Sequence, residues 1–555
     1  MVNFKEYVFN RLIWIALFEQ KELIKGFDAF NLYIDSLKEL QKNEEIATEA
    51  KIEEKMSKLI LLNKLTELLD KFFDEKDYAN TAICGNLLIK IKAFSHIKFF
   101  KFKKAMEELG QKDLAYNYYL YVLEHFSDDV SKLSEKAKLC AEMQDWEKAI
   151  FYMEKHINSQ QTLVTGQDYN LLGCWCNSYY SDVKRDKDIL KKSLESFKKA
   201  YSLDKQVLYA KNVTIMAGKS FDNETSNYYW NEIINNFPMS NDDKYDYAAH
   251  CLKTADFDNY HKYFDARFKK ENNATPFPKI DKPLWNGQDD ISDKILLVHH
   301  EQGFGDTFLT YGYIPRLIEK CKKIIFVVQD TIEPLLKNNE YGIEILKHSE
   351  VDLEDLVFDY YIPSMSIATT LKYTRENIGV GGGYIKANSE LVKEFKEKYF
   401  QNNKFKIGIS CSGNRIGNKT RDVAISELLE LDNLENVELY YINKDADEKS
   451  FEKFVNNKIN NIAKDFRNFA DTAAAIENLD LVLCTDNGLL NLAGALGKKT
   501  FALFNYDREF RWFDLSGENV VYYDSVKPFL NNSIDDWQSS IQKAIDEIKI
   551  LTGNF

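Results

Sequence analysis

Proline is distributed very unevenly along this chain of 555 residues. Of its 8 prolines, only Pro238 lies within the first 275 residues. Because proline removes a backbone donor and breaks helix interiors, so long a stretch with a single proline is predicted to be almost entirely helical. The chain therefore divides into a helical first half and a second half that is built differently.

The second half contains short runs of β-branched residues that alternate with helix-length segments. The predicted strands are Lys294–Val298, Lys323–Val328, Lys406–Ser410, Val437–Ile442 and Leu479–Cys484. Strands that alternate with helices indicate βαβ units and parallel sheets. Such sheets bind their ligands at the carboxyl ends of the strands.

The composition excludes several classes of protein. Lys plus Arg (73) against Asp plus Glu (87) gives a formal net charge of −14, so nucleic acid is not an expected partner. A hydrophobic content of 45% excludes wholesale disorder. No window of about eighteen uncharged apolar residues is present, so no membrane span is expected, and Met1–Gln20 is predicted to be an amphipathic helix rather than a secretory signal. The 8 scattered cysteines fit reduced thiols in a cytoplasmic protein.

A repeat runs through the helical half. The segment Met143–Asn158 resembles the second helix of a tetratricopeptide (TPR) repeat, with Trp146, Ala149 and Met153 at the aromatic, small and bulky positions. The equivalent positions, at spacings of 34, 44, 33 and 34 residues, are Ala115, Ala149, Ser193, Ser226 and Tyr260. We attribute the spacing of 44 to a charged insertion near Ser181–Asp188. Residues 1–100 are expected to be helical but have no assigned phase, and a generic helical bundle is the alternative. A stacked array has a concave face that can hold a protein.

A glycine-bearing turn follows the first predicted strand. The stretch Ile295–Thr307, ILLVHHEQGFGDT, runs from that strand into a predicted helix, Phe308–Cys321. Gly303 and Gly305 allow close backbone approach, and the helix N-terminus offers N–H groups to a polar ligand. Asp306 adds a carboxylate at the carboxyl end of the strand. The alternative is that Asp306 only caps the helix.

Several blocks of the second half resemble the TPR-linked members of glycosyltransferase family nine, the family of the lipopolysaccharide heptosyltransferases. The blocks, which together span about residues 255–545, are Phe264–Thr307 (FDARF, PLWNG and EQGFGDT), Ile407–Asp422 (with a Ser-Gly-Asn turn and a basic segment), Phe469–Gly497 and the pairs Arg511–Trp512 and Asp536–Trp537. The resemblance implies a GT-B fold, in which two Rossmann-like domains enclose a cleft. We therefore expect a helical TPR-like acceptor-binding domain at residues 1–270, a first Rossmann-like acceptor-side domain at 290–385 and a second, nucleotide-sugar domain at 400–545. The glycine-rich run Ile378–Gly383 is predicted to be the hinge between the two.

The resemblance also implies roles for individual residues. Asp306 matches the proposed catalytic base, which would take the proton of the attacking hydroxyl. Lys419 and Arg421 match a basic segment that contacts the donor diphosphate, although a solvated basic loop is the alternative. The acceptor-side loop comprises His300, Gln302, Gly303 and Gly305. The expected donor-binding residues are Ser412, Gly413, Asn414, Lys419, Arg421, Asp486, Asn487, Gly488 and Asn491.

The chain departs from the family pattern at two of these positions. Asn487 replaces the usual Thr and Asn491 the usual His, and asparagine cannot carry a charge or shuttle a proton. No metal ligand is predicted, because Asp445-Ala-Asp447, which imitates a metal-binding DxD motif, lies in a highly charged loop. His299 is expected in the core, and His300 is the one that could reach the cleft.

These observations lead us to expect a metal-independent glycosyltransferase that needs no cofactor beyond its nucleotide-sugar substrate. The concave face of the TPR-like array would present a protein acceptor, such as flagellin or another surface protein. Two alternatives stay open. One is a protein-binding scaffold with an inactive GT-B half, and the other is an enzyme that extends a glycolipid.

Overall fold

The computed structural model describes most of the chain. The described residues are 14–19, 21–42, 47–93, 95–126, 129–159, 161, 163–270, 280–337, 340–412, 421–444, 459–506, 512–513 and 517–553. The chain forms two compact units, Met1–Met216 and Ala217–Phe555, and the division falls inside helix α11 (Val207–Lys219). Within the described ranges, no helix combines the length and apolar character needed to cross a membrane.

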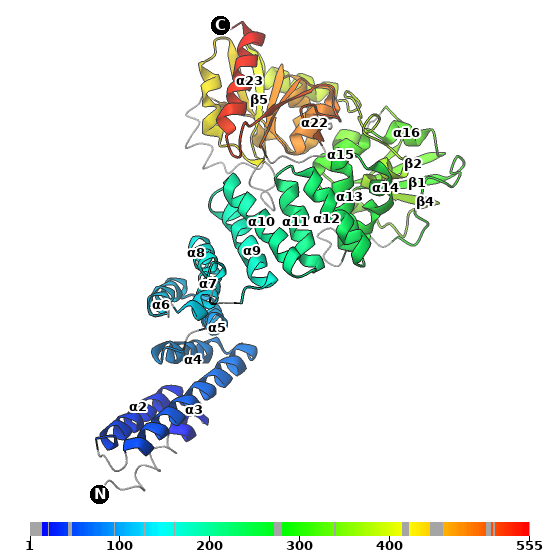
Figure 1. The fold of residues 1–555 in the computed structure, drawn as a ribbon. Helices are drawn as coiled ribbons and strands as arrows, with labels where there is room; N and C mark the ends of the chain where they lie inside the picture. Colours follow the sequence, from blue (N-terminus) through cyan, green and yellow to red (C-terminus); the bar gives the residue numbers. More distant parts are fainter. Residues whose placement is uncertain are drawn as a thin grey trace. The chain divides into compact units, whose positions relative to one another are not determined.

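The first unit is built from helices, as the scarcity of proline predicts. They follow one another along the chain with short connections (Figure 1). Their bounds are α2 Leu23–Leu40, α3 Ala47–Asp74, α4 Tyr78–Lys90, α5 His96–Glu108, α6 Lys112–His125, η1 Val130–Lys132, α7 Leu133–Glu142, α8 Trp146–Ile157, α9 Gly166–Asp182 and α10 Lys187–Leu203. The helix pairs bury apolar side chains between them, which is the packing of a TPR-like array.

Aspartate N-caps mark the repeat. In α4 and α8 the caps are Asp77 and Asp145, and each side chain accepts the backbone N–H three residues further on. Four residues after each cap lies a fully buried residue, Thr81 in α4 and Ala149 in α8. Thr81 lies 34 residues before Ala115, so the repeat extends into the region that had no assigned phase.

The spacing of 44 residues has a structural cause. Helices α9 and α10 are 17 residues each, whereas α7 has 10 and α8 has 12. The charged insertion near Ser181–Asp188 therefore lengthens the two helices of one hairpin instead of adding a long loop.

A glycine allows α9 and α10 to approach closely. The Ser193 hydroxyl donates to the Gly173 carbonyl oxygen at 2.8 Å. A Cβ atom on Gly173 would lie 2.7 Å from the ring of Phe197, which is closer than carbon atoms pack. The pairing of these helices thus requires a residue without a side chain at position 173.

We expect Gly173→Ala to destabilise the helical array by about 1–3 kcal/mol, because the added methyl overlaps the buried Phe197 ring. The matched control is Gly218→Ala, since a Cβ on Gly218 in α11 would meet nothing within 4 Å. That control should be neutral or stabilising by up to about 1 kcal/mol. Urea unfolding followed by far-UV circular dichroism measures both, and equal effects would contradict this account of the helix contact.

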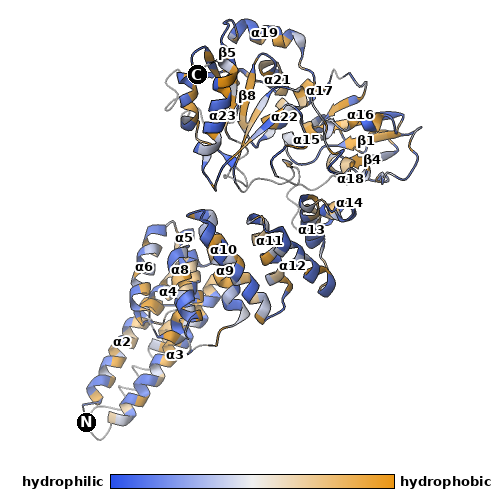
Figure 2. Cartoon of the chain, turned by 45° about the horizontal axis from the view of Figure 1, so that its top comes forward, coloured by the Kyte–Doolittle hydropathy of each residue, from blue (hydrophilic) through white to orange (hydrophobic). Residues whose placement is uncertain are grey.

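The second unit contains two parallel sheets. The first has the order β3-β2-β1-β4 and the second the order β10-β9-β8-β5-β6-β7. Their strands are β1 Ile295–His299, β2 Lys323–Val328, β3 Glu344–Lys347, β4 Tyr360–Pro363, β5 Phe405–Ser410, β6 Val437–Tyr441, β7 Ile459–Asn461, β8 Leu481–Thr485, β9 Thr500–Phe504 and β10 Val526–Leu530. Figure 2 colours the strands largely as hydrophobic, as expected for parallel strands covered on both faces.

Helices flank both sheets and precede the first one. Their bounds are α12 Asn223–Asn236, α13 Asn241–Thr254, α14 Phe257–Tyr263, η2 Phe264–Lys269, α15 Phe304–Tyr311, α16 Ile314–Ile318, α17 Glu333–Leu336, η3 His348–Glu350, η4 Ser364–Ser366, α18 Ile367–Thr370, α19 Ser389–Tyr399, η6 Ile425–Asn433, η7 Ala463–Asp465, α21 Phe469–Glu477, α22 Gly488–Leu496 and α23 Trp537–Thr552. The predicted fold class, a helical array before a pair of Rossmann-like α/β domains, is confirmed.

The three domains that we predicted, with their acceptor-binding, acceptor-side and nucleotide-sugar roles, stay predictions. The first sheet lies within residues 290–385 and the second within 400–545. Helices α12–α14 were assigned to the acceptor-binding domain at 1–270, and they form one compact unit with the sheets.

The predicted helix Phe308–Cys321 is wrong as a single element. The segment forms α15 and α16, because Pro315 cannot continue a helix and instead stands in the first turn of α16. The two helices are separated at Gly312, where a Cβ atom would lie 2.7 Å from the Val380 side chain.

The glycine-rich connection between the sheets is closely packed. The N–H groups of Val380 and Gly381 both donate to the Tyr522 carbonyl oxygen at 3.0 Å. A Cβ on Gly379 would lie 2.7 Å from the Val521 carbonyl oxygen. The run Ile378–Gly383 therefore lies against the second sheet's domain, and its role as a hinge stays a prediction.

Candidate functional site

Two helix starts meet where the two sheets face each other. Helix α15 follows β1, and α22 follows β8, so each begins at the carboxyl end of a strand. A Cβ on Gly305 would lie 2.6 Å from Nδ2 of Asn491 and 3.3 Å from Cα of Gly488. The backbones of the two helix starts are thus nearly in contact. The predicted acceptor-side loop and the predicted donor-side turn therefore lie next to each other.

Asp306 lies at this junction, in the first turn of α15. Its Oδ2 atom accepts the N–H of Gly303 at 3.0 Å, and the side chain is half-buried. The capping contact that we considered as the alternative is therefore present. A carboxylate can accept about four hydrogen bonds, so the capping role does not by itself exclude a role as a base. Gln302 and Gly303, directly before α15, are exposed.

Asn487 is the N-cap of α22. Its Oδ1 accepts the N–H groups of Leu489 and Leu490 at 2.9 and 3.2 Å. Its Nδ2 donates to the Ser410 hydroxyl at 2.9 Å and to the Ser412 carbonyl oxygen at 3.2 Å. Asparagine in place of the family's threonine thus joins the start of α22 to the end of β5, because it can accept and donate at once.

Asp486 connects the basic segment to the start of α22. It is buried, its Oδ1 accepts the indole N–H of Trp512 at 3.0 Å, and its Oδ2 lies 3.5 Å from Nη1 of Arg421. Arg421 keeps 37% of its side-chain surface exposed. A partly exposed guanidinium therefore lies beside the N-terminus of α22, where the helix dipole also favours an anion.

Asn491 packs beneath Gly305. Its Oδ1 accepts the Tyr523 hydroxyl at 2.9 Å, and its Nδ2 lies 3.4 Å from the carbonyl oxygen of Asn487. The residue is buried, so its observed contacts are with the protein, and its role in donor binding stays a prediction.

The turn after β5 is only partly described. The Nδ2 of Asn443 donates to both the carbonyl oxygen and the hydroxyl of Ser412 at 2.8 Å, which anchors the start of this turn. Several predicted residues lie outside the described part of the chain, namely Gly413, Asn414, Lys419, Asp445, Asp447 and Arg511.

His299 and His300 stand at the end of β1. His299 is buried, as predicted, and burial lowers its pKa to about 4. Burial, together with the neighbouring His299 and His348 rings, lowers the pKa of His300 to about 3. Both rings are therefore neutral at pH 7.

A buried ion-pair network, which we did not predict, holds the acceptor-side loop. Nε and Nη2 of Arg267 donate to the two oxygens of Glu301 at 3.0 and 2.8 Å, and Nη1 donates to Asp265 at 2.6 Å. Burial opposes the charge on Arg267, but the two carboxylates raise its pKa. Glu301 lies between His300 and Gln302, so the network fixes where the loop begins. The sequence signal that could have revealed this network is Arg267, which lies between Phe264 and Phe268 in the FDARF motif. An arginine that is buried among aromatic residues needs a carboxylate partner.

We expect Asn487→Ala to destabilise the second unit by about 2–3 kcal/mol, because it removes a helix cap together with buried bonds to Ser410 and Ser412. Asn388→Ala is the matched control, since Asn388 caps α19 through the same two bonds but is exposed. The control should cost about 1 kcal/mol or less. Urea denaturation measures both, and an equal loss would show that the bonds to the β5 end contribute nothing.

The fold and the site together define a class: a TPR-like helical array with a GT-B-like pair of Rossmann-like domains. This is the arrangement expected from the sequence. No known family profile matches the chain. Protein FlbA of Caulobacter vibrioides is 22% identical over 313 residues, which are 52% of this chain and 51% of FlbA. The chain thus spans about half the length of this curated relative.

Solved structures of both expected types are similar to parts of the chain. A glycosyl transferase family 9 structure from Veillonella parvula is 12% identical (TM-score 0.38) and covers 48% of this chain and 100% of its own. The ADP-heptose LPS heptosyltransferase II of E. coli is 11% identical (TM-score 0.36), covering 46% and 98%. A tetratricopeptide repeat protein from Parabacteroides merdae is 10% identical (TM-score 0.28), covering 49% and 95%.

Proposed function

We propose that this protein is a glycosyltransferase that takes its sugar from a nucleotide-sugar donor. The observation that carries the proposal is the close approach of Gly305 to Gly488, which brings the Asp306 segment next to the start of α22. An anionic diphosphate suits the α22 N-terminus and the partly exposed Arg421 beside it. The motif resemblance to glycosyltransferase family nine supports the same assignment.

The proposed chemistry uses groups of both domains. Asp306 takes the proton from the acceptor hydroxyl as its oxygen attacks the anomeric carbon. The bond between that carbon and the diphosphate oxygen breaks, and negative charge grows on the departing nucleotide. Arg421, the positive end of the α22 dipole and the N–H of Gly488, which the Asn487 cap does not engage, stabilise this charge, and Lys419 would add to them. Such fixed positive groups allow a transfer step without a metal ion or other cofactor.

We further propose a protein acceptor held by the helical array of a cytoplasmic enzyme, with flagellin or another surface protein as the acceptor class. Four exposed aromatic and aliphatic side chains on α6 offer apolar surface that a bound protein would cover. They are Leu114, Tyr116, Leu120 and Tyr121. A glycolipid acceptor is the alternative for the same catalytic site.

An inactive scaffold is the second candidate function. One observation favours it: Asn491, which replaces the family's histidine, accepts a hydrogen bond from Tyr523 and has no titratable group. A scaffold needs neither a donor site nor a base. The scaffold therefore predicts no sugar transfer and no nucleoside diphosphate binding, whereas the enzyme predicts both.

We expect Asp306→Asn to lower the transfer rate by about 100-fold or more, because the amide cannot accept a proton at neutral pH. The amide oxygen can still accept the Gly303 N–H, so the fold should be kept. Asp293→Asn is the matched control, since that side chain is 74% exposed. Transfer from a panel of nucleotide sugars is the measurement. Full activity in Asp306→Asn would remove the assignment of the base.

Nucleoside diphosphates should bind the wild-type chain, and Arg421→Gln should weaken the binding by about 10- to 150-fold, because a charge-assisted contact contributes about 1.5–3 kcal/mol. Lys393→Gln, at a side chain that is 77% exposed, is the matched control. Isothermal titration calorimetry measures both. If no nucleoside diphosphate binds the wild type, the scaffold is the better account.

A further inference from the structure

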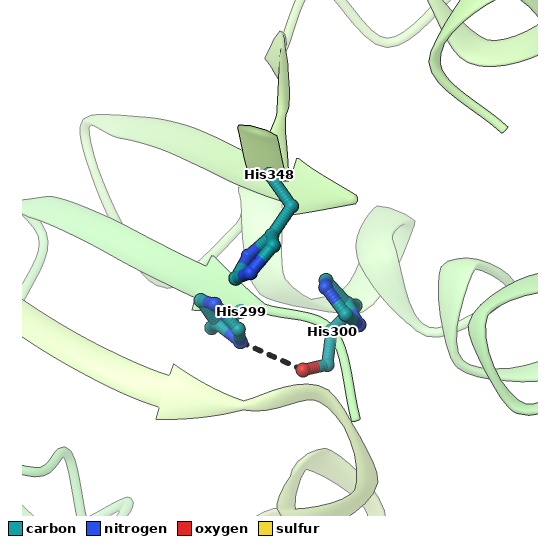
Figure 3. Close-up of side chains that lie close together, drawn as sticks. All are labelled: His299, His300 and His348. Atoms are coloured by element: carbon teal, nitrogen blue, oxygen red, sulfur yellow. Dashed lines mark hydrogen bonds between the residues drawn. The ribbon is translucent and has the colours of Figure 1, made fainter. Parts of the chain in front are cut away.

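Three histidines gather at the strand ends of the first sheet. His299 is the last residue of β1, His300 follows it, and His348 begins η3 directly after β3. One ring nitrogen from each lies within 4.8 Å of the other two, and Figure 3 shows the His348 ring turned toward the other two rings. Three of the 8 histidines of the chain are thus in one place, although β1 and β3 are not neighbours in the sheet order.

The first ring is held in the tautomer that a metal ligand needs. Nδ1 of His299 lies 2.7 Å from the carbonyl oxygen of His300, the bond drawn in Figure 3. A carbonyl oxygen only accepts, so Nδ1 carries the proton and Nε2 keeps its lone pair. A hydrogen bond from one ring nitrogen to a backbone carbonyl is the usual way in which proteins orient a ligating histidine.

The second ring has polar atoms that the protein does not satisfy. Both Nδ1 and Nε2 of His300 are buried, and neither has a hydrogen-bond partner among the described residues. Burying such a group without a partner is unfavourable. The rings of His299 and His300 stack with centroids 4.8 Å apart, and His348 is nearly perpendicular to both. Stacking buries the ring faces, but it gives the ring nitrogens of His300 no hydrogen-bond partner.

We propose that His299, His300 and His348 bind a divalent transition metal ion, for which Zn²⁺ is the best-suited species. Imidazole nitrogen suits Zn²⁺, whereas Mg²⁺ and Ca²⁺ prefer oxygen ligands, which this set lacks. Zn–N bonds of about 2.0–2.1 Å in a tetrahedron place nitrogens about 3.3 Å apart, so the rings must close in by about 1.5 Å. His348 is exposed and can do so by side-chain rotation, and the solvent side leaves room for water as the fourth ligand.

The ion would act as a tie between chain segments. It joins the end of β1 to the start of η3, and one of its ligands, His300, is itself the first residue of the acceptor-side loop. The site therefore complements the ion pair between Arg267 and Glu301. That pair holds the same loop through the residue that follows His300. This inference is independent of the proposed transfer reaction, since a bound ion here takes no part in any step of it.

The experiment is a titration of the full chain, stripped with a chelator and free of any histidine tag, with Zn²⁺. We expect one equivalent to bind and to raise the melting temperature of the wild type. His348→Ala removes an exposed ligand without disturbing the core and should weaken binding by at least about 100-fold, as should His300→Ala. His125→Ala is the matched control, because His125 is exposed on α6 and far from this sheet in sequence.

Calorimetry gives the affinity, and elemental analysis of the dialysed protein gives the stoichiometry. Absence of saturable one-to-one binding to the wild type would overturn the proposal. Binding of unchanged affinity in His348→Ala would overturn it as well, because the ion would then be held elsewhere.

Discussion

The contact on which the second unit depends is the approach of α15 to α22 at Gly305 and Gly488. A side chain on Gly305 would collide with Asn491, so the two helix starts meet only because glycine stands there. A part-buried hydrogen bond and an aromatic contact reinforce the junction. The Tyr384 hydroxyl donates to the Phe308 carbonyl oxygen at 2.9 Å, and the ring of Phe469 packs edge-on against Phe304. The candidate site is therefore part of the packing between the two sheets rather than a feature added to one of them.

Polar side chains around the junction serve the fold and the proposed chemistry together. Asp306 closes the first turn of α15, and Asn487 closes that of α22 while it holds the end of β5. Asn487 thus connects two elements of the second unit at once. Asparagine at position 487 caps a helix as well as threonine does and adds a donor for Ser410.

Sequence reasoning reached the fold class and five of the strands, and it failed where tertiary contacts decide. The five predicted strands are present with their ends shifted by at most two residues. The apolar strand β9 was overlooked, and short edge strands such as β3 and β7 lack the apolar run that would reveal them. The break between α15 and α16 follows from Pro315, a local signal that the sequence prediction overlooked, whereas the packing of Val380 against Gly312 is shown by the fold alone. The Arg267–Glu301 pair and the approach of His348 to His300 join residues 34 and 48 positions apart, so only the fold reveals them.

Hydrogen–deuterium exchange of the full chain, with and without a nucleoside diphosphate, tests the central claim most directly. The backbone amides of Gly488 and of Phe304 and Gly305 opposite it, which the Asn487 and Asp306 caps do not engage, should exchange more slowly when the diphosphate is bound, because its oxygens would accept hydrogen bonds there. Protection that appears only on other segments, with no change at either helix start, would contradict the account.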